Sequence, residues 1–165
     1  MKTKRIAYVG LFIALAFVFS YIEYLMPIHI GIPGAKLGLA NLAIMVCLYT
    51  LGEKDAFFLS IIRILLVGFT FASTASMMYS LAGGILSFAA MVVVKRCKTF
   101  SMTGVSVMGG VFHNVGQIVL AMWVLETESL LYYLPLLMVT GIAAGVVIGL
   151  LGALITKRLK KLINI

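Results

Sequence analysis

Long apolar runs recur from near the start of this chain to near its end, and they constrain its fold more than any other feature. A helix rises about 1.5 Å per residue, so a run of about 20 mainly apolar residues can cross the hydrocarbon core of a membrane. Hydrophobic residues make up 63% of the 165 residues and charged residues only 11%, whereas about a quarter of a soluble domain is charged. The sequence therefore predicts an all-α integral membrane protein without a soluble domain.

Polar, glycine-containing and proline-containing segments divide the apolar sequence into six predicted spans. We expect one transmembrane domain over residues 1–165, with spans near 6–26, 36–52, 56–72, 75–94, 102–124 and 131–155. The first run follows a basic start, as in a signal peptide, but no small-residue cleavage pattern comes after it. We therefore expect this run to remain as the first span.

The basic residues predict the orientation of these spans. The net charge of +8 would suggest a nucleic-acid partner in a soluble protein, but here the charge lies in short clusters between apolar runs. Because cytoplasmic loops are rich in Lys and Arg, we expect both termini in the cytoplasm of a bacterial cell. This orientation places 11 of the 13 basic residues inside: Lys2, Lys4, Arg5, Lys54, Lys95, Arg96, Lys98, Lys157, Arg158, Lys160 and Lys161.

Arg63 is an exception, because it lies near the middle of the third predicted span. A charged side chain at this depth costs about 2.5 kcal/mol or more, so it usually faces a cavity or a partner. Its planar guanidinium suits a carboxylate or a phosphate. Two interpretations remain open from the sequence: an internal ion pair with Glu23, or a clamp for an anionic ligand.

Three polar side chains of the fifth predicted span lie close together in the sequence. His113, Asn114 and Gln117 fall within five residues, at spacings that direct them to adjoining parts of one helical face. They supply hydrogen-bond donors and acceptors rather than a fixed charge. We expect them to line a cavity and orient a polar ligand, although a helix-packing role is the alternative.

The start of the second predicted span adds Lys36 and Asn41, after a segment (residues 27–35, PIHIGIPGA) that we expect to be an outer, non-helical loop. A lysine beside a helix N-terminus makes an anion site, or it extends to the membrane interface instead. Tyr79 and Ser80 of the fourth span add two hydroxyl groups. Since Lys36 and Arg63 outnumber Glu23 among the intramembrane charges, the predicted ligand is an anion.

Motifs for chemistry or nucleotide binding are missing from the sequence. We find no P-loop, no dinucleotide-binding glycine pattern and no metal-ligand spacing of His and Cys. Prenyl or phosphatidyl transfer would require clustered carboxylates that hold Mg²⁺ through substrate phosphates, and the five acidic residues are not clustered in this way. We therefore expect a protein that is not an enzyme and that has no cofactor and no metal site.

Small residues form stripes in the last and first spans. Gly141, Gly145, Gly149 and Gly152 lie on one face of the last span, where they allow another helix to approach closely. That helix could belong to the same bundle or to a partner. A shorter stripe in the first span, Ala7, Gly10 and Ala14, could face a partner subunit.

Four segments carry a family resemblance: PGAKLGLANL (residues 33–42), IIRILL (61–66), YSLAGGILS (79–87) and GGVFHNVGQ (109–117). They resemble the Gx transporter family, also labelled heptaprenyl diphosphate synthase component I. That family is related to the substrate-binding S components of energy-coupling factor (ECF) transporters. The resemblance covers nearly the whole chain and implies a six-helix bundle of the S-component type, with a ligand pocket that opens outward.

The resemblance also implies partners, namely a transmembrane coupling protein and two cytoplasmic ATPases, with Ala7, Gly10 and Ala14 as the docking face. Our leading hypothesis is a substrate-capture subunit of the bacterial plasma membrane for a small anionic metabolite or a vitamin-like compound. In this hypothesis Lys36 and Arg63 neutralise the anion, while Asn41, His113, Asn114 and Gln117 orient it. The alternatives are an accessory or scaffold subunit in flavin- or quinone-linked electron transfer, and an accessory subunit in isoprenoid synthesis.

Overall fold

The computed structural model describes residues 2–25 and 38–163, and within these ranges every regular element is helical. Each predicted span overlaps one α-helix, and a short 3-10 helix precedes the last of them. The elements are α1 (Lys2–Leu25), α2 (Leu39–Thr50), α3 (Glu53–Thr70), α4 (Thr74–Arg96), α5 (Met102–Leu125), the 3-10 helix η1 (Glu128–Tyr133) and α6 (Leu134–Ile163). The predicted outer loop at residues 27–35 lies outside the described residues.

Four segments of the described chain are long and apolar enough to cross a membrane: Thr3–Leu25, Thr74–Arg96, Met102–Leu125 and Glu128–Lys161. The prediction of an all-helical protein with several helices long and apolar enough to cross a membrane is confirmed for the described residues. α2 is apolar but has only 12 residues, about 18 Å at 1.5 Å per residue. α3 has 18 residues and carries Glu53 and Asp55 in its first turn.

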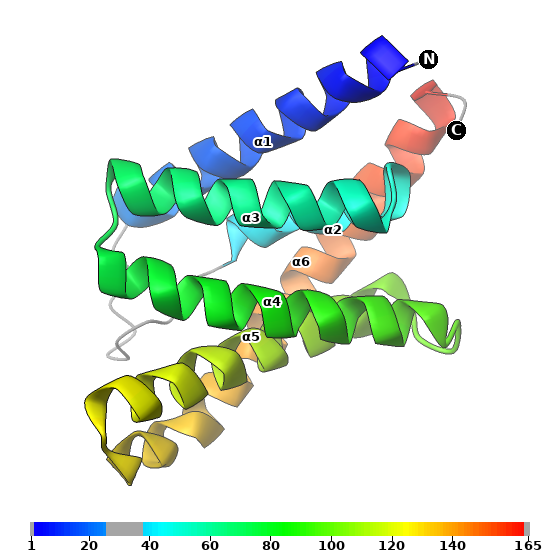
Figure 1. The fold of residues 1–165 in the computed structure, drawn as a ribbon. Helices are drawn as coiled ribbons and strands as arrows, with labels where there is room; N and C mark the ends of the chain where they lie inside the picture. The colour runs from blue at the N-terminus through cyan, green and yellow to red at the C-terminus, as the bar shows by residue number, and fades with distance from the viewer. Residues whose placement is uncertain (1, 26–37, 164–165) are drawn as a thin grey trace.

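The connections alternate between the two ends of the bundle (Figure 1). α1 begins and α6 ends at the same end, where the α2–α3 and α4–α5 turns also lie. The α3–α4 turn and the segment from α5 to η1 lie at the opposite end. This arrangement brings the basic segments of the sequence to one end, which we call the basic end.

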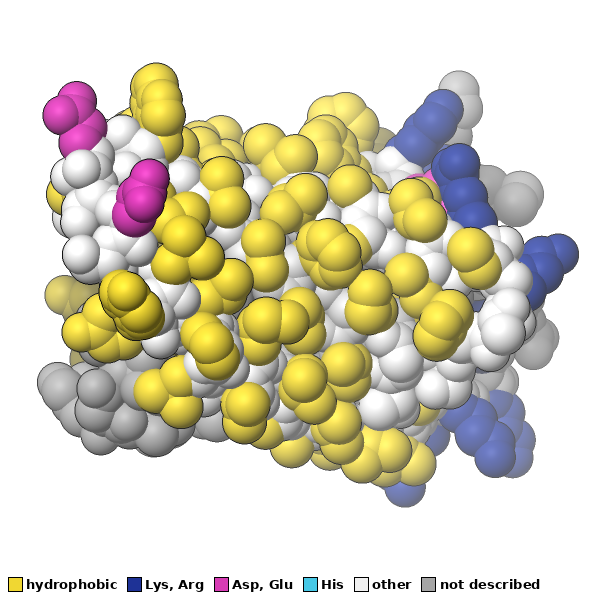
Figure 2. Space-filling view, turned by 90° about the horizontal axis from the view of Figure 1, so that it is seen from below, with side chains coloured by type: hydrophobic (Ala, Val, Ile, Leu, Met, Phe, Trp, Pro, Cys, Tyr) yellow, Lys and Arg dark blue, Asp and Glu magenta, His cyan; other side chains and the backbone are white. Residues whose placement is uncertain are grey.

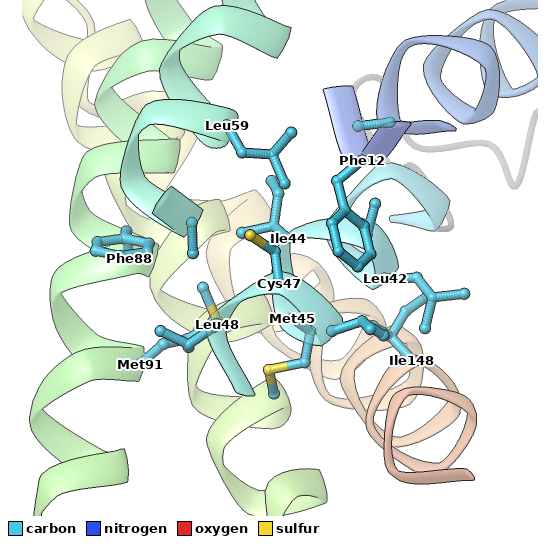
Figure 3. Close-up of a cluster of buried hydrophobic side chains, with 14 of the residues drawn as sticks. Phe12, Leu42, Ile44, Met45, Cys47, Leu48, Leu59, Phe88, Met91 and Ile148 are labelled. Atoms are coloured by element: carbon cyan, nitrogen blue, oxygen red, sulfur yellow. The ribbon is translucent and has the colours of Figure 1, made fainter. Parts of the chain in front are cut away.

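α2 lies at the centre of the fold, where it packs against α1, α3 and α6. Nearly every residue from Ala40 to Leu48 is buried, because an apolar helix surrounded by other helices has no face left for lipid or water. Figure 3 shows side chains from the neighbouring helices, including Phe12, Leu59 and Ile148, converging on it. The short length of α2 suits a packed core element whose N-terminal end opens on a cavity, described below.

Two ion pairs at the basic end connect α1 and α4 to the start of α3. Arg5 Nε and Nη2 donate to the carboxylate of Asp55 at 2.7 and 3.0 Å. Arg96 donates to Glu53 from Nη2 at 2.5 Å and from Nε at 3.3 Å. These pairs use both carboxylates of the α3 first turn, and the Arg96 guanidinium holds the pKa of Glu53 below its ordinary value.

Hydrophobic side chains cover most of the face seen in Figure 2 between its two ends. Large hydrophobic side chains are exposed on the helices, among them Phe69, Trp123 and Val139. Lys and Arg side chains gather at one end of this view, and the other end shows acidic but no basic side chains. An apolar band of this extent suits hydrocarbon and not water, which agrees with the apolar helices found above.

The glycine stripe of α6 packs inside the bundle, against α5. A Cβ atom added at Gly145 would lie 2.6 Å from the Val107 Cα, and one at Gly149 would lie 2.5 Å from the Thr103 Cα. Gly141 similarly faces the α5 backbone. Only glycine permits such an approach of two helices. Gly141, Gly145 and Gly149 therefore face a helix of the same bundle and not a partner.

Candidate functional site

A small cavity lies where the N-terminal end of α2 meets the middle of α3 and α5 and the first half of α6; we call it the polar cavity. Its volume is about 60 Å³, and its wall includes five of the residues that the sequence predicts for the site. The lining residues are Glu23, Gly38, Ala40, Asn41, Arg63, Gly110, His113, Asn114, Gln117, Thr140, Gly141 and Ala144. Asn41, Arg63, His113, Asn114 and Gln117 are thus brought together from three helices.

Arg63 is partly buried and lines the polar cavity from α3. Its Nε is buried and has no hydrogen-bond acceptor, as also holds for the Thr156 hydroxyl among the described side chains. An enclosed N–H donor without an acceptor is costly, because this N–H has given up its hydration. A carboxylate or phosphate oxygen beside this nitrogen would remove that cost.

Glu23 lines the same cavity, but it does not form an ion pair with Arg63 in the described structure. Its Oε1 accepts a hydrogen bond from the Leu39 N–H at 2.9 Å. Leu39 is the first residue of α2, where helix N–H groups have no partner inside the helix and favour negative charge. The alternative of an Arg63–Glu23 ion pair is therefore not what the structure shows: the carboxylate caps α2 instead.

Glycines set the backbone positions around this cavity. Gly38, just before α2, has φ +76°, a left-handed conformation that glycine adopts without steric cost. A Cβ at Gly83 of α4 would lie 2.6 Å from the His113 carbonyl oxygen and 2.8 Å from the Gln117 Cγ. Because Gly83 has no side chain, α4 can approach the polar face of α5. The YSLAGG segment therefore contributes to the site through this close helix contact.

Asn114 already has a structural partner. Its Nδ2 donates to the Leu137 carbonyl of α6 at 2.5 Å, and the Thr140 hydroxyl donates to the same carbonyl at 2.9 Å. The Asn114 amide therefore joins α5 to α6, which is the helix-packing role that the sequence left open as the alternative for Asn114. Asn114 also lines the cavity, so it combines a packing contact with a place in the wall.

The two predicted hydroxyl residues lie on two larger cavities beside α4. Ser80 lines a cavity of about 560 Å³ between α1, α3 and α4, which Arg63 and Glu23 also line. We call it the aromatic cavity, after Tyr24 and Phe71 in its wall. Tyr79 lines a third cavity of about 510 Å³ between α4, α5 and α6, where it is joined by Gln117. Lys36 lies outside the described residues.

The predicted docking residues Ala7, Gly10 and Ala14 are all exposed on α1. A Cβ added at Gly10 would meet nothing within 4 Å. The stripe on α1 thus differs from that on α6, since no helix of the described chain covers it. The described residues also contain no group of three or more His, Cys, Asp or Glu that could hold a metal ion.

Thr140 and Ser76 are among the lining residues that sequence reasoning missed. Thr140 lines the polar cavity from α6, one residue before Gly141. Ser76 lines both larger cavities from the first turn of α4. A hydroxyl residue next to a small-residue stripe is a signal that could have pointed to Thr140, whereas nothing in the sequence separates Ser76 from the neighbouring serines.

Comparison with known families gives a match over most of the chain. The sequence model described as heptaprenyl diphosphate synthase component I matches residues 12–155. Searches of curated proteins and of solved structures found no match.

Proposed function

The chain belongs to the heptaprenyl diphosphate synthase component I family, and from this premise and the polar cavity we propose that it captures a small anionic metabolite or vitamin-like compound for uptake. The protein would be a six-span subunit of the bacterial plasma membrane with both termini in the cytoplasm. The observation that carries the proposal is the buried Arg63 Nε without an acceptor, beside a cavity lined by amide side chains. A bound anion would supply the missing acceptor.

The arrangement of charge supports this role. Positive charge at bilayer depth is costly, and it is usually found where it serves a ligand, an ion path or a partner. Glu23 caps α2, and among the described residues Arg63 forms no ion pair. Asn41 and Gln117 bring further donors and acceptors to the same wall, which suits the orientation of a polar ligand.

Partners belong to the same proposal. The exposed small residues Ala7, Gly10 and Ala14 offer α1 to a close helix contact, as expected for docking to an ECF-type coupling protein with its ATPases. The chain would bind and release its substrate without converting it. Energy for uptake would come from those partners.

The test is to identify molecules that remain bound after purification in lipid nanodiscs, using native mass spectrometry of three proteins. We expect the wild type to carry an anionic molecule. Arg63→Gln should lower its occupancy about tenfold to a hundredfold, because a charge-assisted hydrogen bond contributes about 1.5–3 kcal/mol. The matched control is Arg158→Gln, an exposed residue at the basic end that lines none of the three cavities, and it should retain the molecule.

An empty wild type, or a bound molecule whose occupancy is the same in Arg63→Gln, would overturn the proposal. If Arg63→Gln does not fold, Gln117→Ala provides a second variant in the same wall, for which we expect a smaller loss. A bound flavin or quinone would instead favour the electron-transfer role.

The family description favours one further candidate, an accessory role in heptaprenyl diphosphate synthesis. A diphosphate is an anion, so the Arg63 guanidinium could receive one of its phosphate groups. This role predicts Mg²⁺-dependent elongation of a prenyl diphosphate when the protein is added to a soluble prenyltransferase. Equal elongation rates with and without the protein would exclude it.

A further inference from the structure

The polar cavity is too small for a whole metabolite. Its volume is about 60 Å³, room for a few water molecules or for one carboxylate or phosphate group. Ligand pockets for small molecules usually have volumes of about 300–1,000 Å³. A ligand whose charged group occupies the polar cavity must therefore place the rest of its atoms elsewhere.

The aromatic cavity adjoins the polar cavity at the charged residues. Arg63 and Glu23 line both of them, so the guanidinium stands at the boundary between the two spaces. The aromatic cavity has a volume of about 560 Å³, which falls in the range of a small-molecule site. Val67, one helical turn after Arg63, lines only the larger space.

The wall of this larger space is apolar and aromatic in part, with Ile64, Val67, Phe71 and Met77, and it also carries the hydroxyls of Ser20, Ser73, Ser76 and Ser80. Phe71 lies against three rings of α1: its centroid is 5.6 Å from that of Phe17, 5.4 Å from that of Tyr21 and 5.1 Å from that of Tyr24. Such tilted and edge-to-face ring pairs hold one another in place. Met77, on the α4 side of the same cavity, adds a side chain that adapts to irregular apolar shapes.

We propose, building on the proposed function, that the ligand is an amphiphilic anion. Its single carboxylate or phosphate group lies at Arg63, and its apolar or aromatic body fills the aromatic cavity between α1, α3 and α4. The juxtaposition that carries this inference is a guanidinium N–H without an acceptor at the edge of a space of ligand size whose wall includes Tyr24, Phe71 and Met77. A fully hydrophilic anion would find partners in the serines of that space but would leave its apolar residues, such as Val67 and Phe71, without a matching surface.

The test compares anions that share a head group but differ in their body. Acetate, 3-phenylpropanoate and 3-phenylpropyl phosphate are titrated into the nanodisc-embedded protein by calorimetry, with neutral 3-phenylpropanol as a fourth probe. We expect 3-phenylpropanoate to bind about tenfold to a hundredfold more tightly than acetate, since burying a phenyl group is strongly favourable. The phosphate probe shows which head group Arg63 prefers, and the alcohol should bind most weakly of the aromatic probes.

Two variants locate the apolar body. Val67→Trp fills the aromatic cavity, so it should lower the affinity for 3-phenylpropanoate to about that for acetate and leave acetate unchanged. Leu66→Trp is the matched control: it makes the same residue one position earlier, on a side chain that is 39% exposed and lines none of the three cavities. It should change neither affinity.

The outcomes separate this inference from the proposed function. Equal affinities for acetate and 3-phenylpropanoate, both lost in Arg63→Gln, would refute the amphiphilic ligand while anion capture stands. An advantage of the aromatic probe that persists in Val67→Trp would also refute it, because the body would then lie elsewhere. Absence of binding by every anion would count against both.

Discussion

Replacing Gly145 with alanine adds a methyl group where α6 already touches the backbone of α5. The new Cβ would lie 2.6 Å from the Val107 Cα, whereas ordinary contact begins at 3.4 Å. The helices must therefore separate locally by about 0.8 Å, the difference between those two distances. A backbone atom cannot rotate away as the end of a side chain can, so the helices themselves must shift at this contact.

Overpacking of this kind costs about 1–3 kcal/mol. For a chain of 150–250 residues each kcal/mol lowers the Tm by about 2–4 °C, so we expect the Tm of Gly145→Ala to fall by about 2–12 °C. The control is Gly10→Ala on the uncovered face of α1, where a Cβ meets nothing within 4 Å. That variant should melt at the wild-type temperature or slightly above, because alanine is the better helix former.

The assay uses the chain's own thiols. Cys47 is fully buried at the centre of the core and Cys97 is exposed. In a Cys97→Ser background, a thiol-reactive fluorogenic dye therefore reports unfolding through Cys47. If Gly145→Ala melts at the same temperature as Gly10→Ala, the close approach of α5 and α6 is refuted.

Three further predictions concern hydrogen bonds and ion pairs. Glu53→Gln should lower the Tm at pH 7, because it removes the ion pair with Arg96. Arg96 lowers the pKa of Glu53 from its ordinary 4.5, so the Tm difference from wild type should persist above pH 4.5 and vanish as the pH falls through the folded-state pKa. Thermal melts across pH 3–7 check this. Glu23→Ala removes the cap at Leu39 and should destabilise the protein by about 0.5–2 kcal/mol, with faster hydrogen exchange in the first turn of α2; unchanged exchange there would contradict the cap. Asn114→Ala removes the hydrogen bond to α6 and should cost about 0.5–1.5 kcal/mol in a denaturation series, whereas a change in ligand affinity alone would mean that the amide serves only the ligand.

The sequence predicts much of this protein because the relevant signals are local. Apolar run length is sufficient to place the helices, since backbone groups in hydrocarbon must bond within their own segment. Helix ends differ by a few residues from the predicted limits, most of all in α6, which continues to Ile163 through a basic segment predicted to lie beyond the span. The helix extends because Lys and Arg, although they end the hydrophobic run, have high helix propensity.

The sequence identified several residues of the candidate site, but it predicted only in part which of them lie together. Arg63 and Gln117 were identifiable because polar groups in apolar helices are rare and costly. Whether they meet depends on helix packing, which places both on the polar cavity but assigns Tyr79 and Ser80 to two different spaces.

The sequence by itself determined the helical class, the positions of the apolar segments and the gathering of basic residues in alternate connections, because each depends on neighbouring residues along the chain. Only the tertiary structure decided which partner each polar or small residue takes. Glu23 caps α2 and does not pair with Arg63, and the α6 glycines face α5 while Gly10 stays uncovered. Such choices depend on distances between helices that are far apart in sequence, and residue spacing carries no information about those distances.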